Sequence, residues 1–318
     1  MFSYFLLIWF LFVSITMSFS SSSLFFLWLC LEINMMSFIP LMFSKNLITM
    51  NSIMMYFLIQ SSASSIYIFS ISTYLINLMA IPYLTNLINI SMLIKLGAAP
   101  FHMWFPQVSE GLSLNILLIL LTIQKMIPLY ILSLFKNNFM LIPIMLSASV
   151  GSMGGFNQFS IRKILAFSSI AHLAWIMVLQ LLESNFWLVY LTLYSTIMTM
   201  LIMLINPFAI NNLNFSKKTN LNSSLLLILM LLSLGGMPPT LGFVMKWMTL
   251  KIVMNYMMIL TIPLILSSII NLFFYLRLAY NSMMKYLNLY KWEKLPTPKL
   301  LMIMLFQLTS IFILISTI

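Results

Sequence analysis

Apolar stretches about 20 residues long recur from one end of the chain to the other, with only short polar segments between them. A helix of about that length crosses the hydrocarbon core of a bilayer. Within that core the backbone must satisfy its own hydrogen bonds, which an isolated extended segment cannot do. The hydropathy is also too continuous for a β-barrel, whose strands alternate apolar and polar residues. The pattern therefore predicts an all-α protein that crosses a membrane many times.

Composition excludes several other classes. Of the 318 residues, 62% are hydrophobic and only 6% are charged, whereas charged residues make up about a quarter of a soluble domain. The net charge of +11 is spread over loops and forms no basic patch with interleaved aromatic residues, so no nucleic-acid partner is expected. The single cysteine, Cys30, excludes a disulfide within the chain.

The apolar stretches divide into about eleven predicted spans. With alternating loops, the loop lysines and arginines other than Lys136 and Lys251 fall on one side of the membrane, as the positive-inside rule requires. The N terminus is therefore expected on the basic side and the C terminus on the opposite side. The predicted spans are Met1–Phe19, Ser22–Phe43, Thr49–Ser72, Tyr83–Trp104, Leu112–Phe135, Asn138–Asn157, Ile161–Leu181, Ser184–Asn206, Asn222–Lys251, Tyr256–Ser282 and Lys299–Thr317.

Two segments of the chain resemble each other. Residues 92–105 read MLIKLGAAPFHMWF and residues 230–243 read MLLSLGGMPPTLGF. They lie five spans apart, so the two copies would have opposite orientations, as in the inverted repeats of many transporters. We expect one membrane domain with a first repeat over residues 1–135, a second over 138–282 and a C-terminal helix over 299–317.

Both segments carry glycine and proline where a spanning helix should continue. Proline removes a backbone donor and clashes with the preceding turn. Interrupted helices at membrane depth are tolerated where they are buried in protein or line a water-filled cavity. We therefore predict broken helices in the fourth and ninth spans.

Ionisable residues inside the apolar spans are the strongest functional signal. Each such residue costs about 2.5–3.5 kcal/mol near the bilayer centre, yet Glu32, Lys95, Lys125 and Lys246 all lie within predicted spans. Burial disfavours the charged form of an amine, and a nearby carboxylate favours it, so a Glu–Lys pair followed by lysines can act as a gated proton relay. His172 is a further candidate because an imidazole titrates near neutral pH. The alternatives are structural roles for Glu32 and His172, and lysines that snorkel to the interface or bind a backbone carbonyl, Lys246 more than Lys95 or Lys125.

The sequence offers few residues for cofactor or phosphate binding. Two histidines, with His102 expected near an interface and His172 on another span, could hold at most one haem. There is no cysteine cluster for an iron–sulfur centre, no glycine-rich phosphate loop and no aspartate at all. We expect no redox cofactor in this chain.

Four motifs carry a resemblance to a known family. They are KLGAAPFHMWFPQVSEG (residues 95–111), TIQKMIP (122–128), GGFNQFSIRKILAFSSIAHLAW (154–175) and LGGMPPTLGFVMKW (234–247). Together, and in this order, they resemble the antiporter-like membrane subunits of mitochondrial respiratory complex I. The resemblance runs through essentially the whole chain.

The resemblance implies a set of roles. Glu32 would pair with Lys95, Lys125 would be the central relay, Lys246 would open toward the exit side, and His172 would lie on the axis that joins them. The basic side would face the matrix of the mitochondrial inner membrane. The resemblance also assigns NADH, flavin, iron–sulfur clusters and ubiquinone to partner subunits, and leaves membrane lipids such as cardiolipin as ligands of the chain itself.

The function that we expect is proton translocation from the matrix to the intermembrane space, coupled to NADH oxidation by ubiquinone. Its partners would be neighbouring antiporter-like subunits, small hydrophobic subunits and accessory subunits of the membrane arm. Two alternatives stay open: a structural spacer that seals the membrane arm without pumping, and a free-standing cation/proton antiporter.

Overall fold

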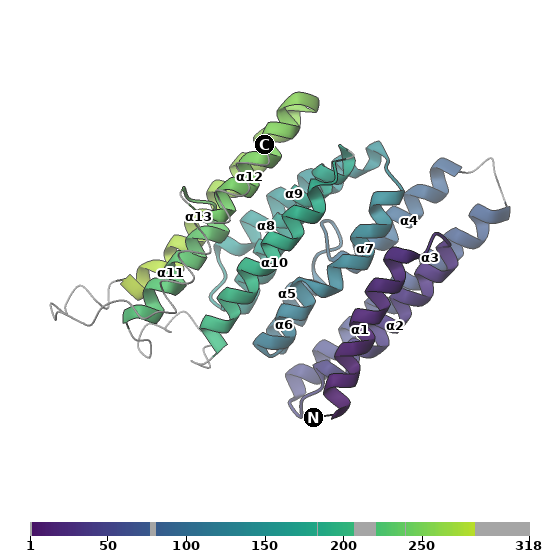
Figure 1. The fold of residues 1–318 in the computed structure, drawn as a ribbon, viewed down its shortest axis with the longest axis horizontal. Helices are drawn as coiled ribbons and strands as arrows, with labels where there is room; N and C mark the ends of the chain where they lie inside the picture. The colour runs from purple at the N-terminus through teal and green to yellow at the C-terminus, as the bar shows by residue number, and fades with distance from the viewer. Residues whose placement is uncertain (1, 77–80, 183, 207–220, 239, 284–318) are drawn as a thin grey trace. The chain divides into compact units, whose positions relative to one another are not determined.

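The computed structural model describes residues 2–76, 81–182, 184–206, 221–238 and 240–283. Figure 1 shows these residues as helices joined by short connections. Seven of the helical segments are long and apolar enough to cross a membrane, and three shorter apolar helices accompany them. The predicted all-α membrane fold is thus confirmed for the described part of the chain.

The chain divides into two compact units, Met1–Ser147 and Ala148–Ile318. In the first unit α3 packs against α2, α4 and α5, and α7 packs against α1, α2 and α4. The helices α1, α2 and α3 lie side by side in Figure 1. The elements are α1 (Phe2–Ser20), α2 (Leu24–Met42), α3 (Leu47–Ile76), α4 (Ile81–Leu96), α5 (Trp104–Gly111), α6 (Leu114–Leu121), α7 (Ile123–Leu134) and a short 3₁₀ turn, η2 (Asn138–Met140).

Helix α9 is the core of the second unit. In its most apolar stretch 89% of the residues are buried. The helix packs against α10, α12 and α13. The elements are α8 (Leu141–Phe156), which contains the boundary between the units, α9 (Ile161–Leu181), α10 (Phe186–Ile205), α11 (Leu221–Gly235), α12 (Leu241–Tyr256), the 3₁₀ turn η5 (Met258–Leu260) and α13 (Thr261–Met283).

The predicted span over residues 299–317 lies outside the described residues. The count of about eleven spans and the inverted-repeat organisation therefore stay predictions. The division between the compact units falls within α8, after the predicted limit of the first repeat at residue 135.

Both glycine- and proline-containing segments interrupt their helices, as predicted. Helix α4 ends at Leu96, and Gly97 follows with φ +66°. Helix α11 ends at Gly235, and Gly236 follows with φ +82°. A positive φ favours glycine because it lacks a Cβ. The similarity between the two segments had aligned Gly97 with Gly235, but the structure gives the matching conformation to Gly236, one residue later.

A third interruption was not predicted. The sequence indicated one continuous span over residues 112–135, whereas the structure divides it at Thr122 between α6 and α7. The Thr122 hydroxyl donates to the carbonyl of Leu118 at 2.7 Å, and this type of back-bonding is known to bend helices. Lys125 consequently lies in the first turn of α7 and not in the middle of a long helix.

Candidate functional site

Lys95 is buried at the end of the first broken helix. Its side chain is 6% exposed, in the last turn of α4. The half-buried Glu32 on α2 exerts a Coulombic interaction on it. The backbone carbonyl of Lys95 accepts a hydrogen bond from the Gln60 amide at 3.1 Å, and the carbonyl of Ile94 accepts one from the Trp104 indole at 3.1 Å. Side chains from α3 and α5 thus satisfy carbonyls that the helix break exposes.

Lys125, on α7, is linked through Phe105 to the break that follows α4. It is 3% exposed, and its Nζ atom is 5.2 Å from the ring centroid of Phe105, within the range of a cation–π interaction. Phe105 in turn packs on Gly97, where a Cβ would approach the ring carbons to 3.0 Å. The absence of a side chain at the break therefore makes room for the ring that contacts Lys125.

One small polar cavity lies between these two lysines, and a second adjoins Lys95. Each has a volume of about 10 Å³, close to the roughly 10–15 Å³ that one water requires. Lys95 lines both cavities, Lys125 lines one of them, and Asn34 on α2 lines the other. Both are also lined by Tyr56, Gln60 and Gln124. The polar walls give each cavity hydrogen-bonding groups for a single water, and the first cavity is bordered by both Lys95 and Lys125.

Lys246 caps the second broken helix. Its side chain is 6% exposed, and Nζ donates to the carbonyl of Gly235 at 2.7 Å, with the carbonyl of Leu234 at 3.4 Å. These are the last two residues of α11. A Cβ at Gly236 would come within 3.1 Å of Nζ, so this glycine leaves space for the ammonium group. An amine at this end of a helix also meets the negative end of the helix dipole.

The other terminal carbonyls of α11 are satisfied by the backbone. The N–H of Gly236 donates to Leu232 and Ser233, and the N–H of Met237 donates to Leu232. This pattern is the Schellman motif with glycine at its left-handed position. The last four carbonyls of α11 are therefore all accounted for, and two of them depend on Lys246.

His172 lies in a buried cluster of aromatic and hydroxyl side chains. It is 2% exposed on α9, and its Nδ1 is 2.7 Å from the hydroxyl of Tyr190 on α10. The ring of Tyr194, one turn further along α10, is centred 4.9 Å from the imidazole. Tyr275 on α13 interacts electrostatically with Tyr190. The histidine is thus fixed in place by residues from a neighbouring helix.

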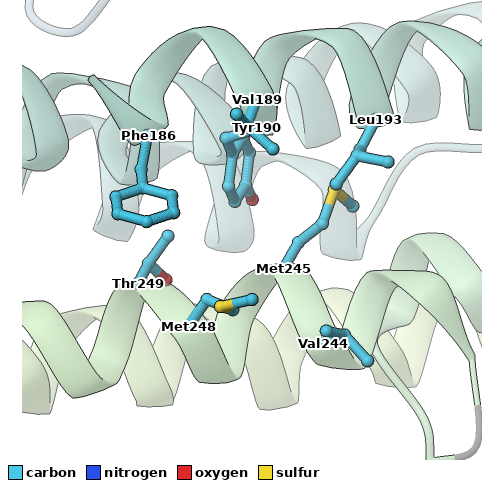
Figure 2. A pocket seen from close by; sticks show the side chains of 8 residues that line it. All are labelled: Phe186, Val189, Tyr190, Leu193, Val244, Met245, Met248 and Thr249. Atoms are coloured by element: carbon cyan, nitrogen blue, oxygen red, sulfur yellow. The ribbon is translucent and has the colours of Figure 1, made fainter. Parts of the chain in front are cut away.

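An apolar groove of about 320 Å³ runs between α10 and α12, next to this cluster. Figure 2 shows side chains of α10 and α12 facing each other across it, with the Tyr190 ring in its wall. Its lining residues are Phe186, Val189, Tyr190, Leu193, Val244, Met245, Met248 and Thr249. Tyr190 therefore contacts both the groove and His172.

The structure groups the predicted residues within the units. Glu32, Lys95 and Lys125 belong to the first unit, and His172 and Lys246 belong to the second. Lys246 is buried and donates to the carbonyl of Gly235, which is the contact described by the structural alternative of a lysine bound to a carbonyl.

Sequence reasoning missed several polar neighbours of these groups. They are Tyr56, Trp104, Gln124 and Tyr190. Uncharged polar residues are common in spans, and only their contacts distinguish them.

Comparison with known proteins identifies the family. The family model described as "NADH:quinone oxidoreductase/Mrp antiporter, TM" matches residues 21–271. The chain is 44% identical to NADH-ubiquinone oxidoreductase chain 2 of Anopheles gambiae, over 83% of this chain and 81% of that protein. The chain belongs to the NADH:quinone oxidoreductase/Mrp antiporter family of membrane subunits.

A further relative and two solved structures extend the comparison. The chain 2 of Rhipicephalus sanguineus is 41% identical over 86% of this chain and 87% of that protein. A chain of respiratory complex I from Thermus thermophilus has the same fold, with a TM-score of 0.81 at 20% identity over 93% of this chain and 73% of that one. A chain of the Mrp complex from Dietzia sp. has a TM-score of 0.78 at 17% identity. The match covers 92% of this chain and 61% of the Mrp chain.

Proposed function

We propose that this protein is a proton-translocating subunit of the membrane arm of respiratory complex I. It would carry protons from the mitochondrial matrix to the intermembrane space while NADH is oxidised by ubiquinone in partner subunits. Its relatives of about 40% identity are named as chain 2 of that enzyme, which supports the assignment to the complex.

The observation that carries the pumping role is the burial of three lysines beside helix interruptions. Lys95 ends α4, Lys246 caps α11, and Lys125 follows the break at Thr122. Buried ionisable groups at membrane depth are costly and typically mark ion or proton pathways. At an interruption, helix-terminal carbonyls offer acceptors to an amine, as Gly235 does to Lys246. A small polar cavity adjoins both Lys95 and Lys125.

The order of transfer that we propose begins with the contacts of the first unit. Movement of the Glu32 carboxylate relative to Lys95 changes the electrostatic interaction that favours the charged amine. A proton released from Lys95 passes through the small cavity to Lys125. The family resemblance adds His172 and Lys246 as the later members of the path. The chain would cross the inner membrane about eleven times, as two inverted repeats and a C-terminal helix, with its N terminus in the matrix.

The test replaces Lys125 with methionine, which keeps an unbranched side chain without the charge. The complex that carries Lys125→Met should assemble and oxidise NADH, but its ratio of pumped protons to transferred electrons in proteoliposomes should fall. Lys251→Met is the control, because Lys251 is exposed on α12 and lies outside the proposed relay.

A normal ratio in an assembled Lys125→Met complex would contradict the proposal and favour the structural spacer. Proton or cation flux by the isolated chain in liposomes would instead favour a free-standing antiporter.

A further inference from the structure

Two buried amide side chains of the first unit carry polar atoms that the protein itself does not satisfy. Among the residues that the structure describes, Oδ1 of Asn34 and Nε2 of Gln124 are shielded from solvent and have no hydrogen-bond partner. Asn34 is 3% exposed on α2, and Gln124 lies in the first turn of α7. Buried polar atoms are almost always hydrogen-bonded. The two atoms therefore point to a small polar ligand between these helices.

Both amides border the second of the two small cavities. Leu31, Asn34 and Met35 line its α2 side, and their spacing of three and four residues places them on one face of that helix. Asn34 borders this cavity and not the first one. The volume of about 10 Å³ is close to the roughly 10–15 Å³ that one water requires. A single water can donate to one amide and accept from the other.

The position of the Gln124 amide is fixed by Tyr56. The Tyr56 hydroxyl donates to Oε1 of Gln124 at 3.2 Å, and the Tyr56 ring packs edge-on against Phe38, with 5.3 Å between the ring centroids. If the oxygen and nitrogen of the amide were exchanged, Nε2 would bond to the phenol and Oε1 would have no partner. One polar atom of Gln124 is left over in either orientation. Water can bond to both kinds of atom, so the water site does not depend on which orientation is present.

Lys95 borders the same cavity. It lines both small cavities, whereas Lys125 lines the first of them. The second cavity is thus on the α2 side of Lys95, and α2 also carries Glu32. A charged amine donates hydrogen bonds, and a neutral amine has a lone pair that accepts one. A water beside the amine can serve both states, because it can present either its oxygen or a hydrogen.

We propose that Asn34 and Gln124 are positioning residues that hold one ordered water against the amine of Lys95. This inference rests on the proposed function, in which Lys95 passes a proton to Lys125. The water gives the Lys95 amine a hydrogen-bond partner both before and after the transfer. A buried polar group that loses its partner is costly, so removal of the water should hinder the cycle of Lys95 between its charged and neutral forms.

A density map of the whole complex, at a resolution that shows ordered waters, tests the site without any substitution. A peak should lie roughly 2.7–3.2 Å from the side-chain amides of Asn34 and Gln124 and from Nζ of Lys95. Well-defined side chains with no peak between them would overturn the inference. That outcome would leave the proposed function standing, because Lys125→Met decides it separately.

The functional test compares Asn34→Leu with Asn89→Leu in the assembled complex. Leucine is similar in size to asparagine but has no polar side-chain atoms. Asn89 is the matched control, since it lies fully buried on α4 in the same unit and borders neither cavity. Within the described part of the chain its amide also has no hydrogen-bond partner. The two variants therefore remove the same group at similar burial, once beside Lys95 and once elsewhere.

The readout is the ratio of pumped protons to transferred electrons in proteoliposomes. In Asn34→Leu the ratio should fall toward the value of Lys125→Met, and in Asn89→Leu it should stay at the wild-type value. A wild-type ratio in an assembled Asn34→Leu complex, or the same fall in both variants, would refute the positioning role.

A double variant distinguishes one shared water from two independent contacts. If one water links both amides, Asn34→Leu and Gln124→Leu each remove it. The double variant should then pump no worse than the more impaired single variant, whereas the effects of independent sites add. A ratio reduced by the sum of both losses would contradict the shared site.

Discussion

The contact between Lys246 and the end of α11 makes a sharp prediction for two adjacent glycines. Gly236 has φ +82°, and a Cβ there would lie 3.0 Å from Cδ and 3.1 Å from Nζ of Lys246. At Gly235 a Cβ would meet Leu272 at 3.5 Å, an ordinary van der Waals contact. Gly236→Ala and Gly235→Ala therefore add the same methyl group to neighbouring positions with different surroundings.

The expected difference follows from the local geometry. Alanine at a left-handed position costs roughly 1–2 kcal/mol, and displacement of the Lys246 ammonium weakens a hydrogen bond worth about 1.5–3 kcal/mol for a charged donor. At Gly235, which ends α11 with ordinary contacts, alanine is favoured over glycine by roughly 0.5–1 kcal/mol. The two variants should thus differ by about 3 kcal/mol or more, which is over a hundredfold in an equilibrium constant.

The assay measures thermal inactivation and proton pumping of the assembled complex. Gly236→Ala should lower the temperature of half-inactivation and reduce the proton-to-electron ratio, since the same contact holds a proposed relay group. Gly235→Ala should pump like the wild type and should inactivate at an equal or slightly higher temperature. Equal behaviour of the two variants would refute the reasoning that Gly236 exists to accommodate the capping lysine.

Two further substitutions test how the second unit is held together. Gly242→Ala should prevent assembly, because a Cβ there would overlap the carbonyl oxygen of Ser233 in the backbone of α11, and normal levels of assembled complex would contradict this packing. Arg277→Lys should destabilise the complex by about 1–3 kcal/mol, since the guanidinium donates to the carbonyls of Phe156 and Gln158 at 2.7 Å each and lysine cannot span both. A thermal inactivation curve that matches the wild type would show that these bonds contribute nothing.

Several properties of this protein are decided by sequence alone. Apolar stretches of spanning length require helices, because a bilayer offers the backbone no other hydrogen-bond partner. The helix interruptions at Gly97 and Gly236 follow from glycine and proline chemistry. The candidate relay residues stand out because charge inside an apolar span is costly and rare.

Tertiary structure decided what surrounds these charges. Neither the alignment of the two similar segments nor residue type showed that Lys246 caps α11, that Gln60 satisfies the carbonyl of Lys95, or that Tyr190 and His172 share a hydrogen bond. The break at Thr122 was missed because threonine is ordinary in a span and only its contact with a carbonyl reveals it. Burial cost depends on residue type and can be read along the chain, whereas hydrogen-bond partners depend on which helices pack together, and that is set by contacts distant in sequence.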